Sequence, residues 1–577
     1  MSTVRVLLAW VLLACAFVAS AQEPSPRLSI EELLPNPRFH DDAAGWHFNR
    51  ARLVEDAGPD GLAAIELEGK EDDLEGHAYM SVAVGVAGET IEVLARSRGL
   101  ADNQRLAIRV AAWAWKNDEW ERTGNEAESF LLPSVAWRSC KLSFEVPADS
   151  TLVVGFYSER SEPIVVADVH VRLAGPPPAD APPDQAGSLT LTQLRELTLG
   201  WRDTAQRLRG LSFSDPPNFQ VITRRRYAAT VAGSMSGLPG DMVFLQEALQ
   251  MLGVMGPDEH LVQSIASAVE TGGHGYYFVP LNTILVAADT PMDTLPAVAI
   301  HELGHALDEQ RFEYWHDYQH DDPLDLDASL VKQSLIEGAA TALMDEFMRE
   351  EIREGRAPAD LAAKAGSTGV RGSVSKSAGS TYVRLRNWMP YSAGAVFFGA
   401  GRLDTSLESL ATALNRGFEH EPRSMAQLLH PRAYWGAEEV TEPVEVLMAD
   451  IAIDIGDEWS LAAEGTMGEP IVAALGGTPT PVGAFDPVSH AQASWTNVAA
   501  KGWAADRWQL YQADEASVVI LCIRWETEAD ANEFVALTGM VGRATFLRSG
   551  TLVVLAVGDE GAPTSEAAAA ALKYAGR

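Results

Sequence analysis

A proline-rich stretch, AGPPPADAPPDQAGS at residues 174–188, separates two parts of the sequence that differ in periodicity. Such a segment has little capacity to form a helix or a strand, so it predicts a linker. Apolar residues alternate with polar ones before it, as in strands, and recur every three or four positions after it, as in helices. The chain of 577 residues is also too long for a single hydrophobic core. We therefore expect a multidomain protein with a different fold on each side of the linker.

Residues 27–173 contain short alternating runs such as IRVAAWAW, CKLSFEVP and IVVADVHVRL, with turn clusters such as VPADS between them. This pattern predicts an all-β sandwich. The opening LLPNPRFHDDAAGWHF and the closing VVADVHVRL resemble the jelly-roll modules that stand beside catalytic domains in carbohydrate-active and other secreted enzymes. That resemblance implies an accessory module with a carbohydrate as its candidate ligand. Trp113 and Trp115 share one face of a strand, where they either stack on a sugar ring or belong to the core.

The part after the linker divides again by composition. Residues 189–445 are mainly helical in pattern, as in LTLTQLRELTLGWRDTAQRLRGL. Residues 446–577 combine strand-like runs such as SVVILCIRW and TLVVLAVG with helix-like runs such as TEADANEFVALTG and SEAAAAALKYAG. We expect a central, mainly α domain followed by an α+β C-terminal domain.

The N-terminus has the three parts of a secretory signal peptide. Arg5 supplies the positive charge, residues 6–18 are apolar, and the small residues 19–21 form a cleavage site, which predicts a signal peptide at 1–21. The exported protein would be periplasmic or secreted. The run LLAC also resembles a lipoprotein processing site, which would anchor the protein by a lipid on Cys15. The apolar run is too short for a permanent anchor, so no transmembrane segment is expected.

The charge balance and the cysteines exclude other classes of protein. The 80 acidic and 44 basic side chains give a formal net charge of −36. Such a surface repels phosphate backbones and anionic lipids, so nucleic acid is not an expected partner. Cys140 and Cys522 lie far apart in strand-like apolar runs, so we expect buried free thiols and no disulfide.

The segment AIHELGHALDEQ at residues 299–310 carries the chemistry. On a helix, His301 and His305 lie on one face, with Glu302 beside them. Ile300, Leu303 and Leu307 fall on the opposite face and can enter a core. A tetrahedral zinc site needs these two imidazoles, a third protein ligand and an open position for water.

The third ligand has several candidates. A histidine six residues after His305 would indicate a metzincin, but Arg311 occupies that position and excludes the class. His316 and His320 lie in the polar, aromatic segment EYWHDYQHDD and remain alternatives. Glu337 lies in a second helical run, DASLVKQSLIEGAATALMDEF, among small same-face neighbours that leave room for a metal. A separation of 32 residues from His305 allows a helix, a loop and a return helix.

At this point the sequence resembles a known family. HELGHALDEQ followed by LIEGAATAL is similar to the bacterial and archaeal gluzincin-like metallopeptidases with HELTHALQDQ followed by ALVEGDA. MPYSAGAVFF, EPRSMAQLLHPRAYW, GWAADRWQLY and WETEADANEF agree as well, and the resemblance covers about residues 190–560. The chain departs from the family at Gly304, at Asp308 and Glu309, and at Ala339, where a carboxylate near the third ligand is missing.

The resemblance implies a zincin-like metallopeptidase domain at 189–445 and an exported peptidase that acts on peptide or protein substrates. His301, His305 and Glu337 would hold one Zn²⁺ per chain, and Glu302 would act as the general base. The strand-like NTILVAAD at 282–289 would be the edge strand that pairs with substrate backbone.

Two further residues and one rival function complete the predictions. Tyr391 in PYSAG and His430 in LLHPRAY are candidate donors to the oxyanion of the tetrahedral intermediate. The rival is a catalytically inactive zincin scaffold that serves as a surface or carbohydrate-binding protein. The presence of Glu302 favours the enzyme, because a decayed site is expected to lose its base first.

Overall fold

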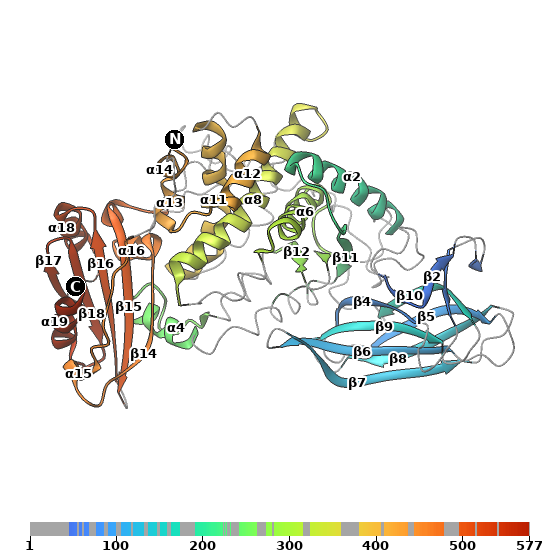
Figure 1. Ribbon diagram of the computed structural model, residues 1–577, viewed down its shortest axis with the longest axis horizontal. Helices are drawn as coiled ribbons and strands as arrows, with labels where there is room; N and C mark the ends of the chain where they lie inside the picture. Colours follow the sequence, from blue (N-terminus) through green and yellow to red (C-terminus); the bar gives the residue numbers. More distant parts are fainter. Residues whose placement is uncertain are drawn as a thin grey trace, which may run out of the picture.

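The computed structural model describes most of the chain between residues 46 and 575. Its longer gaps are 69–76, 100–105, 132–136, 174–190, 232–241, 262–272, 315–323, 359–379, 437–443 and 478–494. The predicted signal peptide, the alternative lipid site at Cys15 and the proline-rich linker all lie outside the described residues. Figure 1 shows a sandwich of strands, a group of helices and a second sheet along the length of the molecule.

The N-terminal part is a β-sandwich, as the alternating pattern predicts. Its two five-stranded sheets have the orders β1-β4-β9-β6-β7 and β2-β3-β10-β5-β8, and all of their pairs are antiparallel. The strands are β1 (Trp46–Asn49), β2 (Ala51–Val54), β3 (Ala64–Leu67), β4 (His77–Gly85), β5 (Thr90–Gly99), β6 (Leu106–Lys116), β7 (Glu119–Leu131), β8 (Arg138–Glu145), β9 (Ser150–Ser158) and β10 (Ile164–Leu173).

One core fills the space between these two sheets. In β5, buried and partly exposed residues alternate along the whole strand, so one face enters the core and the other faces outward. Ile91 and Val93 of β5 meet Val154 and Phe156 of the opposite sheet in this core. The side chains of Trp113, Trp115 and Cys140 lie outside the described residues, so their predicted roles stay predictions.

The central part contains a small mixed sheet that the sequence pattern did not fully predict. The sheet has the order β11-β13-β12, with β11 (Asn218–Ile222) parallel and β12 (Gly275–Phe278) antiparallel to β13 (Thr283–Ala287). The prediction that the 282–289 segment is an edge strand is therefore wrong, because both sides of β13 are paired. The edge strand that packs against helix α6 is β12.

Helices form the rest of the central part. They are α2 (Leu191–Arg209), α4 (Met242–Met251), α6 (Leu295–Phe312), α8 (Leu326–Arg353), α11 (Thr381–Asp404), α12 (Leu410–Glu419), α13 (Met425–Leu429) and α14 (Pro431–Trp435). Helix α8 packs against both α6 and α11, so these three helices meet at one place (Figure 1).

The C-terminal part is an antiparallel sheet with the order β14-β15-β16-β18-β17. Its elements are α15 (Ala452–Ile455), β14 (Ser460–Gly465), α16 (Glu469–Leu475), β15 (Trp503–Ala513), β16 (Ala516–Trp525), α18 (Glu528–Leu537), β17 (Thr545–Ser549), β18 (Leu552–Gly558) and α19 (Thr564–Tyr574). The predicted strands at SVVILCIRW and TLVVLAVG and the two predicted helices are present. The pattern missed β14, whose short SLAAEG sequence lacks β-branched and aromatic residues.

Both faces of this sheet are covered. On one face, Cys522 and Val554 pack with Ala567 and Ala571 of α19. On the other face, residues such as Leu521 share one core with the central helices. The boundary at residue 446 therefore stays a prediction, since a hydrophobic core extends across it. Cys522 is a buried free thiol, as predicted.

Among the described residues, no helix combines the length and the apolar character that crossing a membrane would require.

Candidate metal centre

Helix α6 positions the first two candidate ligands as its periodicity predicts. Ile300, Leu303 and Leu307 are buried in a core with the small sheet, which fixes the helix on one side. His301 and His305 lie on the other side and retain 11% and 15% side-chain exposure. One face of α6 is therefore anchored and the other presents two imidazoles.

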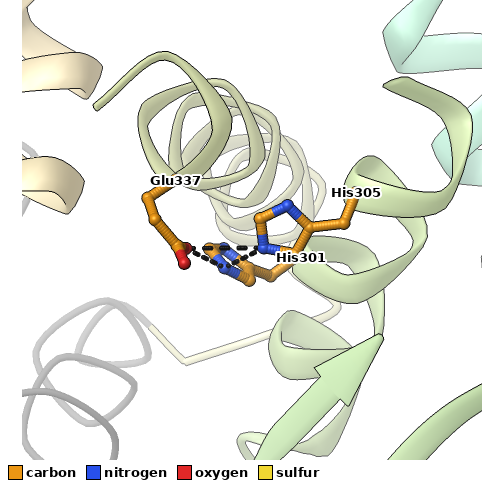
Figure 2. A group of neighbouring side chains, drawn as sticks. All are labelled: His301, His305 and Glu337. Atoms are coloured by element: carbon orange, nitrogen blue, oxygen red, sulfur yellow. Dashed lines mark hydrogen bonds and ion pairs between the residues drawn. The ribbon is translucent and has the colours of Figure 1, made fainter. Parts of the chain in front are cut away.

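Helix α8 supplies the third candidate ligand. Its first turn is capped by Asp325, whose side chain accepts a hydrogen bond from the backbone N–H of Ala328 at 3.1 Å. Glu337 lies about three turns further along and points at the two histidines (Figure 2). His301, His305 and Glu337 form the one group of potential metal ligands found among the described residues.

The three ligand atoms form a nearly equilateral triangle. The Nε2 atoms of His301 and His305 are 3.1 Å apart, and they lie 3.3 and 3.4 Å from Oε2 of Glu337. Ligand bonds of about 2.0–2.1 Å in a tetrahedron place neighbouring ligand atoms about 3.3 Å apart. The three residues therefore fit one face of a tetrahedral zinc site.

The electrostatics of the group are compatible with a shared proton or with a metal cation. Burial alone would lower the pKa of His305, but the carboxylate of Glu337 raises it to about 9. Burial alone would raise the pKa of Glu337, but His305 and hydrogen bonds from both histidines hold it well below its usual range. Three electron-rich atoms at these distances repel one another unless a proton or a metal ion lies between them.

Glu302 lies beside the group without joining it. Its Oε2 accepts a hydrogen bond from the backbone N–H of Tyr277 on β12 at 2.8 Å. Burial raises the pKa of the Glu302 carboxyl, and the two histidines and the Tyr277 hydrogen bond act in the opposite direction. A carboxylate that is fixed at one oxygen keeps the other oxygen available as a proton acceptor.

Tyr391 reaches the group from helix α11. Its ring stacks on His301 with 6.0 Å between the ring centroids, and its hydroxyl interacts electrostatically with the Glu337 carboxylate. Burial and the nearby carboxylates raise its pKa well above the usual value, so the phenol keeps its proton and remains a donor. The structure therefore brings Tyr391 to the predicted ligands.

A close helix crossing makes this approach possible. A β-carbon on Gly338 would lie 2.3 Å from Cα of Gly394, and one on Gly394 would lie 1.9 Å from the carbonyl oxygen of Ser334. Helices α8 and α11 are thus in backbone contact one residue after Glu337 and three residues after Tyr391. Only glycine at both positions permits this contact.

His430 does not join the group. Its Nε2 lies 3.1 Å from Oε1 of Glu469, and 54% of its side chain is exposed. The hydrogen bond to Glu469 raises the pKa of His430. The imidazole of His430 contacts Glu469 of the C-terminal part, so its predicted role as a donor to the oxyanion stays a prediction. His316 and His320 lie outside the described residues.

The predictions from sequence missed two features of the site. Tyr227, which is 2% exposed, donates a hydrogen bond from its hydroxyl to the carbonyl of Gly275 on β12. The second missed feature is the backbone N–H of Tyr277, which donates to Glu302. A backbone donor is not visible in the sequence, because every residue except proline has one. The glycines in TGGHGYYF were the one available signal, since glycine in a strand often marks a close backbone approach.

Comparison with known proteins gives one partial family match. A model for a domain of unknown function (DUF8575) matches residues 460–565, from β14 to the start of α19. No curated protein sequence matches the chain.

Solved structures are similar to parts of the chain. The enzymatically active domain of tailspike protein 4 from bacteriophage CBA120 has 10% identity over 25% of this chain and 21% of its own, with a TM-score of 0.22. A family 16 carbohydrate-binding module has 15% identity over 24% of this chain and 98% of its own, with a TM-score of 0.20. The module TmCBM61, solved with β-1,4-galactotriose, has 14% identity over 25% of this chain and 98% of its own, with a TM-score of 0.20. The chain thus spans about a fifth of the tailspike domain. Similarity at this level does not decide function.

Proposed function

We propose that this chain is an exported, zinc-dependent metallopeptidase of the gluzincin type. The single observation that carries the proposal is the triangle of His301, His305 and Glu337, with Glu302 beside it. A tetrahedral zinc hydrolase needs three protein ligands and a nearby base. The gluzincin-like sequence motifs support the same conclusion.

Each residue has a distinct role in this proposal. His301, His305 and Glu337 would hold one zinc ion, which in such sites acts as a Lewis acid and lowers the pKa of water toward about 7. Glu302 would accept the proton of the attacking water and deliver it to the leaving amine. Tyr391 would keep Glu337 in place and donate to the oxyanion of the tetrahedral intermediate.

The remaining parts of the chain have secondary roles. We propose that the β-sandwich is an accessory module with a carbohydrate ligand, and that the mature protein begins at Gln22. Mass spectrometry of the exported protein tests the second statement, because a diacylglycerol group on Cys15 would contradict it.

The function is tested with the purified mature protein. Zinc content is measured by atomic emission, and cleavage of short peptides and of an unstructured polypeptide is followed by the release of new amino groups. We expect about one zinc per chain, loss of cleavage with a chelator and recovery with added zinc. Full zinc without cleavage would favour the inactive scaffold, and absence of zinc would refute the metal site.

A further inference from the structure

Strand β12 presents an edge to the candidate site. Backbone groups of an antiparallel strand alternate between its partner and the opposite side. The carbonyl of His274 accepts a hydrogen bond from the N–H of Ala287 at 3.0 Å, so residues 274, 276 and 278 face β13. The N–H and C=O groups of Gly275 and Tyr277 therefore face away from β13, on the side where Glu302 lies.

Two side chains already occupy groups on this edge. Glu302 accepts the N–H of Tyr277, and the hydroxyl of Tyr227 donates to the carbonyl of Gly275. An extended peptide that adds to a sheet edge needs such N–H and C=O groups for its own ladder. A peptide that extends past Gly275 along this edge would have to compete with the Tyr227 hydroxyl for the Gly275 carbonyl.

Two glycines at or just before the start of the strand leave space for these two contacts. A β-carbon on Gly273 would lie 2.5 Å from the hydroxyl oxygen of Tyr227. A β-carbon on Gly275 would lie 2.6 Å from Cγ1 of Val298 and 2.7 Å from Oε1 of Glu302. The two glycines thus admit Tyr227 and helix α6 against the same short piece of backbone.

Arg224 holds Tyr227 in this position. Its guanidinium carbon lies 5.4 Å from the centroid of the Tyr227 ring. The same guanidinium pairs with Asp289 at 2.7 Å and donates to the carbonyl of Gly273. Through Arg224, Tyr227 is therefore linked to the residues just before β12 and just after β13.

We propose that Tyr227 determines substrate length at this site by closing the β12 edge at Gly275. The inference rests on the proposed peptidase function and names its substrate class. The preferred substrates are peptides whose chain ends within about one or two residues of the scissile bond on the Gly275 side. A long polypeptide extended through the site on that side is a poor substrate.

A peptide series tests this with the mature, zinc-loaded protein. One cleavable core peptide is extended stepwise with alanines at its N-terminal end or at its C-terminal end, and kcat and KM are measured by mass spectrometry. For the wild type, we expect extension at one end to lower kcat/KM by about tenfold or more, and extension at the other end not to lower it. This series alone tests the closure, whether or not any variant folds.

Tyr227→Phe tests the residue itself, because it frees the Gly275 carbonyl for a substrate N–H. We expect KM for peptides extended at the disfavoured end to fall about tenfold relative to the core peptide. Tyr434→Phe is the matched control, since the Tyr434 hydroxyl also donates to a backbone carbonyl, that of His420. Its length profile should equal that of the wild type.

Two outcomes would overturn the inference. One is an equal length dependence at both ends in the wild type, and the other is the same change in Tyr227→Phe and Tyr434→Phe for every peptide. The Glu302→Gln variant distinguishes failure of this inference from failure of the proposed peptidase function. Absence of all cleavage, or cleavage that persists in Glu302→Gln, would overturn both, whereas Glu302-dependent cleavage without a length effect would overturn this inference alone.

Discussion

Replacing Gly338 with alanine should force apart the two helices that carry Glu337 and Tyr391. The new β-carbon would lie 2.3 Å from Cα and 2.4 Å from the carbonyl carbon of Gly394. Carbon atoms pack at about 3.5–4.0 Å, so α8 and α11 must separate by more than about 1 Å. Overpacking typically costs about 1–3 kcal/mol, and a backbone obstacle belongs at the upper end of that range. Alanine has a higher helix propensity than glycine, which stabilises the helix by up to about 1 kcal/mol. The net loss in the free energy of unfolding is therefore about 2 kcal/mol.

The assay is urea unfolding followed by tryptophan fluorescence, with zinc affinity measured by chelator competition. Gly399→Ala is the matched control, because it lies on α11 and its β-carbon would meet nothing within 4 Å. We expect this control to stabilise the protein by up to about 1 kcal/mol. Gly338→Ala should also weaken zinc binding, since it displaces Glu337. A Gly338→Ala protein as stable as the wild type, or an equal loss in Gly399→Ala, would refute the reasoning.

Three further predictions concern a donor and two buried charges. Tyr391→Phe should lower turnover about 10²–10³-fold with zinc retained, and unchanged turnover would remove Tyr391 from the mechanism. Burial raises the pKa of Asp506 to about 6 from 3.8, so its ionisation should reduce the free energy of unfolding as pH rises from about 4 to 6. Asp506→Asn should flatten that part of the stability profile in urea titrations, and an unchanged slope would contradict the prediction. Arg209 pairs with Asp308 of α6 at 2.6 Å, and its side chain is fully buried. Arg209→Met should cost about 3–5 kcal/mol in denaturant unfolding, and Arg209→Met with Asp308→Leu should lose less. An equal loss in the two proteins would mean that the unpaired charge is not the cause.

The sequence predicted those parts of the site that follow from local periodicity. Two histidines four residues apart must share a helix face, and the structure places His301 and His305 together. Predicting Glu337 required more than local periodicity, because its position near the histidines depends on which helices pack together. The small residues around it and the family-like motif supplied that information. Tyr391 joins the site through the Gly338–Gly394 crossing, and both glycines lie in sequence motifs noted for other reasons.

Other features depend on tertiary contacts that periodicity does not encode. The apolar run of β13 indicates a buried strand, but the order of strands in the sheet decides whether it is an edge. His430 lies in a family-like motif, yet its partner Glu469 is 39 residues away in the C-terminal part. Tyr227 acts through a backbone carbonyl. In the sandwich, alternation predicted the strands, whereas the pairing of β1 with β4 and of β6 with β9 required the structure.

The most direct test of the proposed zinc peptidase function compares Glu302→Gln with Glu337→Ala. Each protein is dialysed against a mild chelator and assayed for zinc and for peptide cleavage. Glu302→Gln should keep nearly one zinc per chain and lose cleavage, because an amide does not accept the proton of water. Glu337→Ala should lose both, since two imidazoles alone hold zinc weakly. Full zinc retention in Glu337→Ala, with loss instead in His316→Ala or His320→Ala, would contradict the assignment of Glu337 as the third ligand.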